Sequence, residues 1–257
     1  MAGEITLRYF QKLPGVEYKA DHSPVTIADR ESEKLLRARI EERYPEHGIL
    51  GEEFGMARPE AELRWLLDPI DGTQSFIRGV PLYGVMMALV ARGPTLEDGA
   101  EHDNALLGVI HLAALRETCV AWRDGGCWWN ETRASVSAVS RLEDALLLGT
   151  DPLSLTAKHA GYTQLRRSVK LERGWGDCYA YVLAATGRAD IVMDPGLAPW
   201  DAAPLLPIIE EAGGRFTDWR GNRTILGGDG FATNGTLHEA VLRMVAPTGH
   251  GAEKRTG

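Results

Sequence analysis

A short apolar run that leads into two acidic residues constrains the fold of this chain more than any other feature of its sequence. Residues 65–67 are Trp-Leu-Leu, and residues 68–73 continue as Asp-Pro-Ile-Asp-Gly-Thr. The apolar residues predict a buried strand, and Pro69 predicts its end, because proline cannot donate to a sheet ladder. Any fold of this chain must therefore accommodate two nearby carboxylates at the carboxyl end of a buried strand.

The carboxylates of Asp68 and Asp71 repel each other unless a cation lies between them. Hard oxygen ligands at this density suit Mg²⁺. Gly72 permits a close approach of the backbone, and Thr73 adds a hydroxyl group. The alternative is a turn with solvated aspartates, since Asp-Pro and Asp-Gly are common turn dipeptides. On these residues alone, the sequence does not favour the metal site over the turn with solvated aspartates.

Three further acidic residues are candidates for the same site. Glu52 follows a short apolar strand at 49–50, whereas Asp29 and Asp201 lie at the starts of predicted helices. Backbone N–H groups and the helix dipole favour anions at such starts. A helix cap is the commoner role for an aspartate in this position. For Asp29 and Asp201 the sequence therefore leaves both a cap and a metal ligand open.

Hydrophobic periodicity and turn residues divide the chain into two halves. The predicted helices cover residues 29–44, 177–187, 201–213 and 237–245. The predicted strands cover residues 65–67, 82–91, 106–112, 117–122, 145–149, 189–193 and 216–217. We expect two domains, residues 1–145 and residues 146–257, which meet near residue 145.

The charge balance limits the partners of the chain. It carries 28 Lys and Arg against 36 Asp and Glu, a net charge of -8, which disfavours nonspecific binding to nucleic acid or to an anionic membrane. No stretch approaches the roughly 18 apolar residues of a membrane span. Residues 1–13 carry charges where a signal peptide has an apolar core. We therefore expect a cytoplasmic protein, and an odd number of cysteines without a CxxC pair also fits a reducing compartment.

Five segments of the sequence appear in a characteristic order: Lys19, residues 23–29 (SPVTIAD), residues 51–53 (GEE), residues 68–73 (DPIDGT) and residues 200–201 (WD). Their combination resembles the inositol monophosphatase family of Mg²⁺-dependent, Li⁺-sensitive phosphatases, over most of the chain. The resemblance implies an α/β (α+β) fold, a layered α/β/α/β/α sandwich of the inositol monophosphatase and fructose-1,6-bisphosphatase type. It implies an N-terminal antiparallel sheet that carries most metal ligands, a C-terminal α/β half that contributes Asp201, and a homodimer that acts on a small phosphorylated substrate.

The resemblance also assigns roles to individual residues. It implies two or three Mg²⁺ ions. The first would be held by Glu52, Asp68 and the Ile70 carbonyl, the second by Asp68, Asp71 and Asp201, and a third by Asp29 through water. Thr73 together with Glu52 would orient and deprotonate the attacking water. The backbone N–H groups of Gly72 and Thr73 would hold the phosphate oxygens.

Three other segments are similar to the bacterial histidinol-phosphate phosphatase branch of the family: residues 75–81 (SFIRGVP), residues 176–179 (GDCY) and residues 232–235 (ATNG). This similarity predicts hydrolysis of L-histidinol phosphate to L-histidinol and phosphate, in histidine biosynthesis. Asp177 and Asp194 would then meet the cationic end of the substrate. The alternative for these two residues is an N-cap and a turn residue.

Three other functions compete with this prediction. One is hydrolysis of inositol 1-phosphate, or of sugar and nucleotide phosphates, by the same site. Another is a phosphatase of the haloacid dehalogenase type, whose two acids need one residue between them; here Pro69 and Ile70 intervene, and the spacing excludes it. The last is a non-catalytic binding protein on the same fold. Such a protein is expected to have lost an acid or the threonine, and here all of them are present.

Overall fold

An eight-stranded sheet forms the first half of the chain in the computed structural model, which describes residues 1–12, 15–19, 24–95, 101–158 and 160–246. Its strands stand in the order β10-β9-β8-β7-β6-β5-β3-β4. All neighbours are antiparallel except β3 and β5, which are parallel. The strands are β3 (Gly48–Gly51), β4 (Gly55–Ala57), β5 (Leu63–Asp71), β6 (Gly84–Thr95), β7 (Glu101–Leu112), β8 (Glu117–Trp122), β9 (Gly126–Trp129) and β10 (Thr132–Arg133). Ser23, the first residue of the motif at 23–29, lies outside the described residues.

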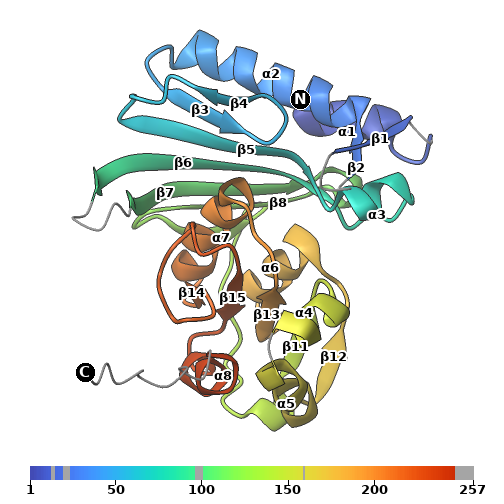
Figure 1. Cartoon of the computed structure of the whole chain (residues 1–257), viewed down its shortest axis with the longest axis vertical. Helices are drawn as coiled ribbons and strands as arrows, with labels where there is room; N and C mark the ends of the chain where they lie inside the picture. Colours follow the sequence, from blue (N-terminus) through green and yellow to red (C-terminus); the bar gives the residue numbers. More distant parts are fainter. Residues whose placement is uncertain (13–14, 20–23, 96–100, 159, 247–257) are drawn as a thin grey trace, which may run out of the picture.

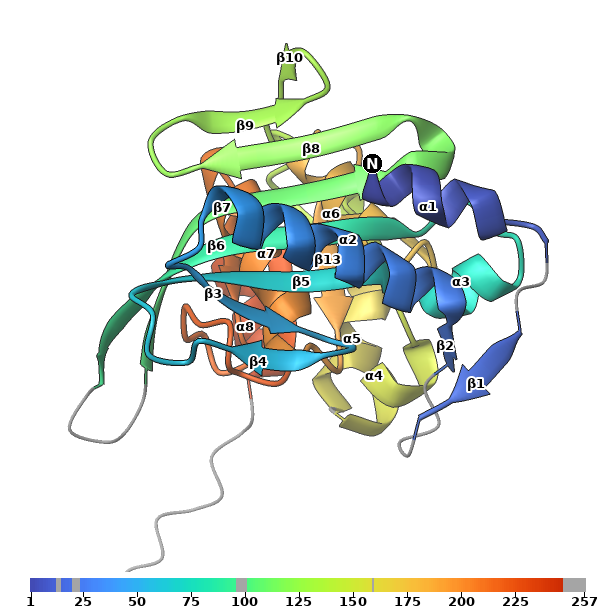
Figure 2. The same ribbon diagram turned by 90° about the horizontal axis from the view of Figure 1, so that it is seen from above.

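Two helices, α1 (Ala2–Tyr9) and α2 (Ile27–Arg43), lie across the outer face of this sheet (Figure 2). A short antiparallel pair, β1 (Val16–Tyr18) and β2 (Pro24–Thr26), leads into α2. The Thr26 hydroxyl accepts a hydrogen bond from the Ala28 N–H at 3.1 Å and caps the helix. This cap places the start of α2 two residues before the predicted start at 29.

A second sheet of five strands forms the other half, in the order β12-β11-β13-β15-β14. Helices α6 and α7 lie between the two sheets, and α4, α5 and α8 cover the far face of the second sheet (Figure 1). This layering confirms the predicted α/β/α/β/α sandwich. The strands are β11 (Leu146–Gly149), β12 (Leu171–Arg173), β13 (Ile191–Asp194), β14 (Arg215–Thr217) and β15 (Gly230–Thr233); the helices are α4 (Pro152–Lys158), α5 (Ala160–Ser168), α6 (Asp177–Ala185), α7 (Pro199–Glu211) and α8 (His238–Val245).

Most predicted elements match the structure to within a few residues. The strands predicted at 106–112 and 117–122 are β7 and β8, joined through the 3₁₀ turn Ala113–Leu115. A second 3₁₀ turn, Leu142–Asp144, precedes β11. The sequence predicted β5 to stop at 67 and β7 to begin at 106, whereas β5 continues to Asp71 and β7 begins at Glu101. Helices α4 and α5 were not predicted. Along the residues with a described structure, every helix is too short or too polar to traverse a lipid bilayer.

The proposed domain boundary near residue 145 falls in the connection between β10 and β11. The largest buried apolar cluster nevertheless joins the two halves, because it contains residues of β6 to β9 together with residues of α6, α7 and β13. The division of the chain into two domains therefore stays a prediction.

Helix α7 is the element that fixes the distance between the two halves. Its residues from Ala202 to Ile209 are all buried, and it packs on β6, β7 and β8. At Gly108 of β7 the helix approaches so closely that an added Cβ would lie 2.2 Å from the Pro204 carbonyl oxygen. Only glycine permits this contact between the two backbones.

We expect the substitution Gly108→Ala to push α7 away from β7. Overpacking of this kind lowers the free energy of unfolding by roughly 1–3 kcal/mol, and urea unfolding monitored by circular dichroism measures it. The control is Gly15→Ala, because a Cβ at Gly15 meets no atom within 4 Å. Equal stability of the Gly108→Ala and Gly15→Ala variants would show that the close approach does not constrain the fold.

Candidate functional site

A one-residue bulge in β5 turns two acidic side chains toward the same side of the sheet. Asp68 pairs with Met86 of β6 and Asp71 pairs with Gly84, so three steps along β5 match two steps along β6. Residues three apart on a regular strand point to opposite faces, and one inserted residue reverses that relation. The carboxylates of Asp68 and Asp71 therefore converge, as the sequence predicted, although the strand continues through Pro69.

The chain leaves β5 through Gly72 and enters the short helix α3 (Thr73–Ile77). Gly72 has a φ of 79°, a left-handed conformation that is strained for residues with a Cβ. The Thr73 hydroxyl donates to the Ile70 carbonyl at 2.9 Å, and Asp68 Oδ1 accepts from the Ile70 N–H at 2.9 Å. Hydrogen bonds therefore hold both the N–H and the carbonyl group of Ile70, in the middle of the predicted motif, next to the two carboxylates.

Asp201 reaches this pair of carboxylates from the second half of the chain. It lies in the first turn of α7, and its Oδ2 accepts a hydrogen bond from the Ala198 N–H at 2.8 Å. Carboxylate oxygens of Asp68, Asp71 and Asp201 nevertheless all lie within 4.8 Å of one another. The two alternatives for Asp201, helix cap and metal ligand, are therefore compatible, because a carboxylate has two oxygens.

Glu52 lies in the turn between β3 and β4, and a buried acidic residue supports this turn. The Glu52 N–H donates to the Leu67 carbonyl at 3.1 Å, which extends the pairing of β3 with β5. Glu33 of α2 is fully buried and accepts from the Glu53 N–H at 2.7 Å. Arg37 neutralises Glu33 across 2.7 Å. Helix α2 therefore holds, through Glu33, the backbone of the turn that carries Glu52.

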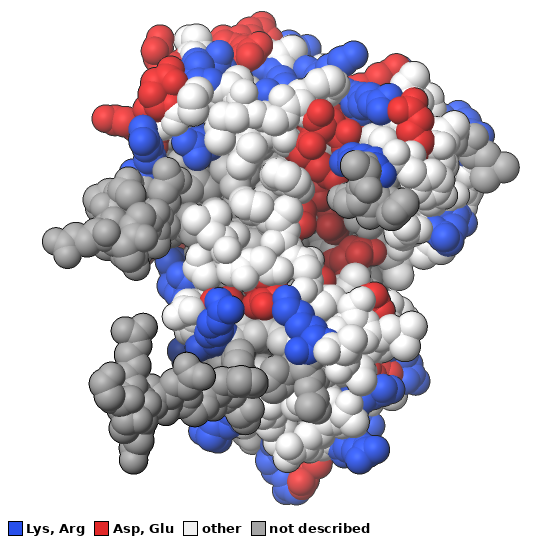
Figure 3. Space-filling model, viewed as in Figure 1, with Lys and Arg blue, Asp and Glu red and all other residues white. Residues whose placement is uncertain are grey.

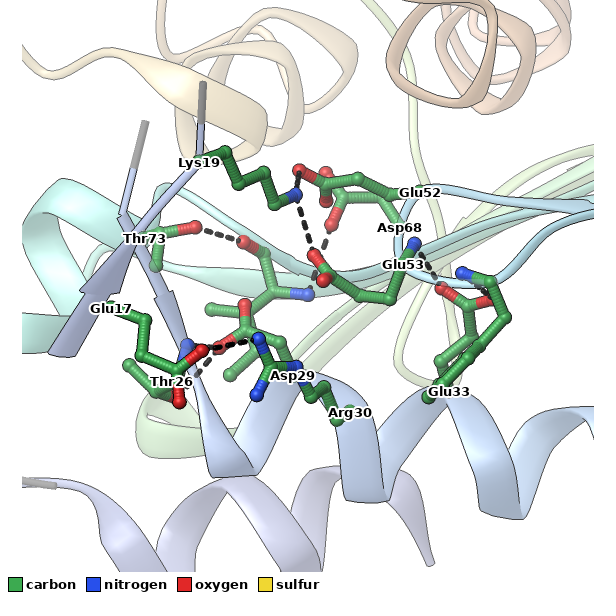
Figure 4. A network of polar contacts seen from close by, with 12 residues as sticks. Glu17, Lys19, Thr26, Asp29, Arg30, Glu33, Glu52, Glu53, Asp68 and Thr73 are labelled. Atoms are coloured by element: carbon green, nitrogen blue, oxygen red, sulfur yellow. Dashed lines mark hydrogen bonds and ion pairs between the residues drawn. The ribbon is translucent and has the colours of Figure 1, made fainter. Parts of the chain in front are cut away.

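Lys19 contributes a positive charge to this acidic wall. Its Nζ donates to Glu52 Oε1 at 2.7 Å and to Glu53 Oε1 at 2.6 Å (Figure 4). Partial burial alone would lower the pKa of Lys19, but the hydrogen bonds from Lys19 to Glu52 and Glu53 outweigh burial and raise it. Lys19 therefore stays cationic and reduces the local repulsion between carboxylates.

Asp29 lies in the first turn of α2 and is 1% exposed. Its Oδ2 accepts from the Thr26 N–H at 2.8 Å and from the Thr26 hydroxyl at 2.6 Å. Burial raises the pKa of Asp29 to about 6, and the charges of Glu53 and Glu52 act in the same direction. Asp29 thus takes part in the cap of α2 as the partner of Thr26, and a contact with a third metal through water stays a prediction.

The acidic residues line a hollow of about 390 Å³ at the junction of the two halves. Figure 3 shows red acidic surface along a hollow on this face of the molecule. The described residues that line the hollow are Glu52, Asp68, Ile70, Asp71, Gly72, Thr73, Gly196, Ala198, Trp200 and Asp201. The structure therefore brings together the predicted residues for two metals and for the attacking water. The described residues that line the hollow do not include Asp29, Asp177 or Asp194.

The three aspartates of the hollow have raised pKa values and hold their protons more tightly than ordinary aspartates. Burial, followed by the charges of Glu52, Asp71 and Asp201, raises the pKa of Asp68 well above its usual range. Burial and the charge of Asp201 raise the pKa of Asp71 to about 7. Burial and the charge of Glu52 raise the pKa of Asp201 to about 7. A divalent cation among these oxygens would replace the protons, and the donor set of carboxylate and carbonyl oxygens fits Mg²⁺.

Asp177 and Asp194 lie at the edge of the site in the second half. α6 begins at Asp177 and β13 ends at Asp194, as predicted. The N-cap of α6 is Gly176, so the N-cap alternative for Asp177 is wrong. An added Cβ on Gly72 would lie 3.0 Å from Asp177 Oδ2, which places Asp177 beside the bulge.

Asp194 is 6% exposed and is the last residue of a strand rather than part of a turn. Its Oδ2 accepts from the Thr150 hydroxyl at 3.0 Å, and Thr150 Oγ1 accepts from the Asp177 N–H at 3.3 Å. Burial raises the pKa of Asp194 well above its usual range. One threonine thus links the carboxylate of Asp194 to the backbone N–H of Asp177.

Sequence reasoning missed Glu33, which holds the turn that carries Glu52. Glu33 stands one helical turn after Asp29, so its position on the same face of α2 could have indicated a role near the acidic segment. Apart from this spacing, Glu33 does not differ in sequence from the other charged residues of the helix.

Comparison with known proteins places the chain in a family. The model of the inositol monophosphatase family matches residues 1–249. The chain therefore belongs to the inositol monophosphatase family, whose members are metal-dependent phosphatases. This confirms the resemblance that the acidic segments indicated.

The relatives carry more than one name. The histidinol-phosphatase of Chlorobaculum parvum is 40% identical, covering 99% of this chain and 95% of that protein. The inositol-1-monophosphatase of Mesorhizobium japonicum is 32% identical, covering 90% of this chain and 85% of that protein. A solved structure of an inositol monophosphatase from Zymomonas mobilis is 35% identical and matches with a TM-score of 0.80, covering 95% of this chain and 92% of that one.

The raised pKa values predict how stability depends on pH without metal. The ordinary pKa of aspartate is about 3.9, and those of Asp71 and Asp201 are about 7. Their contribution to stability is therefore fully present below about pH 4 and is lost as the pH rises through about 7. In EDTA we expect Tm to fall between pH 5 and pH 8, and we expect Mg²⁺ to restore it.

The substitution Asp68→Asn removes one of the repelling charges and keeps an acceptor for the Ile70 N–H. In EDTA at pH 8 we expect this variant to have a higher Tm than the unmodified chain, by roughly 2–4 °C for each kcal/mol of repulsion relieved. We also expect Mg²⁺ to stabilise it less. Asp144→Asn, at a carboxyl group that is 60% exposed, is the control and should change neither quantity. A lower Tm of Asp68→Asn under these conditions would contradict the electrostatic account.

Proposed function

We propose that this phosphatase hydrolyses L-histidinol phosphate to L-histidinol and phosphate and depends on Mg²⁺. The observation that carries the proposal is the convergence of the Asp68, Asp71 and Asp201 carboxylates within 4.8 Å, at a hollow that also contains Thr73. Three ionised acids from two halves of the chain repel one another, and a cation between them relieves this repulsion. An anionic phosphate ester then binds to a negatively charged protein through that cation.

Particular residues would hold the metal. Glu52, Asp68 and the Ile70 carbonyl would bind one ion, Asp68, Asp71 and Asp201 a second, and Asp29 a third through water. When bound, Mg²⁺ supplies positive charge that neutralises the phosphate and makes water easier to deprotonate.

The side chain of Thr73 would orient the attacking water. Its O–H is already donated to the Ile70 carbonyl at 2.9 Å, so its oxygen can only accept a hydrogen bond from water. Glu52, in the same hollow, would receive the proton that the water loses. The backbone N–H groups of Gly72 and Thr73 would donate to the phosphate oxygens.

Asp177 and Asp194 support the choice of substrate. Histidinol phosphate has a phosphate at one end and an ammonium and an imidazole at the other. A charge-assisted hydrogen bond to a partly buried cation is worth roughly 1.5–3 kcal/mol, or about 10–150-fold in affinity. Inositol phosphate offers only hydroxyl groups to these carboxylates. The similarity to the histidinol-phosphatase of Chlorobaculum parvum agrees with this choice.

Inositol 1-phosphate is the second candidate, since one curated relative is an inositol-1-monophosphatase. We expect kcat/KM for histidinol phosphate to exceed that for inositol 1-phosphate by roughly 10–150-fold. We expect Asp194→Asn to reduce this ratio. Steady-state assays of phosphate release, with Mg²⁺ and with EDTA, measure both quantities. Release only with Mg²⁺ also excludes a non-catalytic binding protein.

Asp190 offers a matched control for Asp194. Both aspartates are 6% exposed, and Asp190 directly precedes β13 whereas Asp194 ends it. Asp190 accepts from the Leu146 N–H at 2.7 Å and supports the second sheet. We expect Asp190→Asn to lower stability and to leave the substrate ratio unchanged. Equal or better turnover of inositol 1-phosphate by the unmodified enzyme would contradict the proposal that histidinol phosphate is the substrate.

The role of Thr73 has its own test. Thr73→Ala keeps every carboxylate, so Mg²⁺ binding measured by calorimetric titration should persist while kcat falls about 100-fold or more. The control is Thr156→Ala, because Thr156 also donates to a backbone carbonyl, that of Pro152 at 2.7 Å, but on an exposed helix. Loss of metal binding with a normal kcat at saturating Mg²⁺ would show that Thr73 does not orient water.

A further inference from the structure

The three aspartates that converge at the hollow, Asp68, Asp71 and Asp201, are each held through one oxygen by a backbone N–H group. Asp68 accepts from the Ile70 N–H at 2.9 Å, and Asp201 accepts from the Ala198 N–H at 2.8 Å. In both pairs the donor lies within three residues of the aspartate along the chain. Local backbone geometry therefore orients these two carboxylates, independently of how the two halves pack.

Asp71 differs from the other two, because its donor comes from the second half of the chain. Asp71 Oδ2 accepts a hydrogen bond from the Cys178 N–H, in the first turn of α6, at 2.5 Å. The two residues are 107 positions apart in the sequence. A hydrogen bond of this kind restricts rotation of the carboxylate and leaves its second oxygen available to a metal. The orientation of Asp71 therefore depends on where α6 lies relative to β5.

The backbone that precedes Cys178 has an unusual conformation. Asp177 has a φ of 55°, in the left-handed region that residues with a Cβ seldom adopt. Its N–H donates to the Thr150 hydroxyl of the second half, whereas the next N–H, that of Cys178, donates to Asp71 of the first half. Strained backbone persists where the surrounding contacts require it. The start of α6 is thus held in a conformation that bonds to both halves.

A glycine in β6 permits the close approach of α6 to Asp71. Gly84 pairs with Asp71 across β5 and β6, and a Cβ added to Gly84 would lie 2.8 Å from the Cys178 Sγ. Cys178 is 1% exposed, so its side chain has little room to move away. Because residue 84 has no side chain, Cys178 can lie near enough to Asp71 for its N–H to donate to the carboxylate.

We propose that Cys178 is a positioning residue for the metal site: its backbone N–H fixes one oxygen of Asp71 and leaves the other for Mg²⁺, and Gly84 provides the room for this contact. The proposal rests on the proposed function, since it assigns Asp71 to Mg²⁺. It adds a hydrogen-bond donor that lies outside the set of metal ligands. It also makes Mg²⁺ affinity depend on the docking of α6, in addition to the carboxylates themselves.

The test is the substitution Gly84→Ala, which moves Cys178 away from Asp71 and removes no ligand. Loss of a partner that orients a ligand weakens metal binding by roughly 10–100-fold, and we expect a rise of this size in the Kd for Mg²⁺, measured by calorimetric titration. The double variant Gly84→Ala/Cys178→Ala removes Sγ and keeps the backbone N–H. We expect it to recover most of the lost affinity.

The control for a purely structural effect is Gly214→Ala. A Cβ at Gly214 would lie 2.5 Å from the Thr233 carbonyl oxygen, beyond the end of α7 opposite to Asp201. Overpacking destabilises at either site, so we expect both Gly84→Ala and Gly214→Ala to lower Tm in EDTA. We expect only Gly84→Ala to weaken Mg²⁺ binding.

A second pair of variants tests the same contact from the side of α6, and it serves if Gly84→Ala does not fold. Cys178→Val enlarges the side chain that faces Gly84, whereas Cys178→Ser keeps its size. Both keep the backbone N–H. We expect Cys178→Val to bind Mg²⁺ more weakly than Cys178→Ser, whose affinity should stay close to that of the unmodified protein.

Two results would overturn the proposal. One is an unchanged Mg²⁺ affinity in Gly84→Ala or in Cys178→Val. The other is a double variant that binds Mg²⁺ as weakly as Gly84→Ala alone, since the contact between residues 84 and 178 would then not be the cause. The titration contains no substrate, so a wrong choice of substrate under the proposed function leaves its outcome unaffected. An unmodified protein that binds no Mg²⁺ would contradict the proposed function together with this proposal.

Discussion

Repulsion among buried carboxylates is the interaction on which this structure depends. Asp68 and Asp71 lie on β5 of the first sheet, and Asp201 lies on α7 of the second half, yet their oxygens gather within 4.8 Å. Packing of the two halves therefore brings like charges together, and apolar contacts of α7 must offset their repulsion. A cation that binds these oxygens removes the repulsion and favours the packed state. Metal binding and the docking of the two halves are thus one linked equilibrium.

Several residues around the site hold the acidic side chains in place against that repulsion. Gly108 lets the α7 backbone contact β7, and Glu33 holds the turn that carries Glu52. Lys19 places a cation beside Glu52 and Glu53. These residues lie on β7, α2 and the segment after β1, so the acidic hollow is braced from several elements. Bracing of this kind holds the acidic side chains in place, and preorganisation lowers the entropy lost on binding.

The sequence predicted the parts of the site that local patterns encode. The apolar run before Asp68 indicated a buried strand, and the spacing to Asp71 indicated convergent carboxylates. The order of the acidic segments indicated the family and, through it, the layered fold. The bulge itself was not predicted, because proline normally ends a strand and pairing with β6 is a tertiary contact. Glu33 was missed for a related reason: periodicity marks a residue as buried and cannot show what surrounds it.

The bulge at Pro69 and Ile70 has a consequence for how activity can be lost in this family. Because one extra residue decides which face of the sheet Asp71 occupies, deletion of that residue would restore regular pairing and turn Asp71 toward α2. The acids would all remain, in their usual order, and the apolar layers would still pack. An inactive descendant can therefore keep the acidic residues, and only the spacing between two of them would reveal the loss.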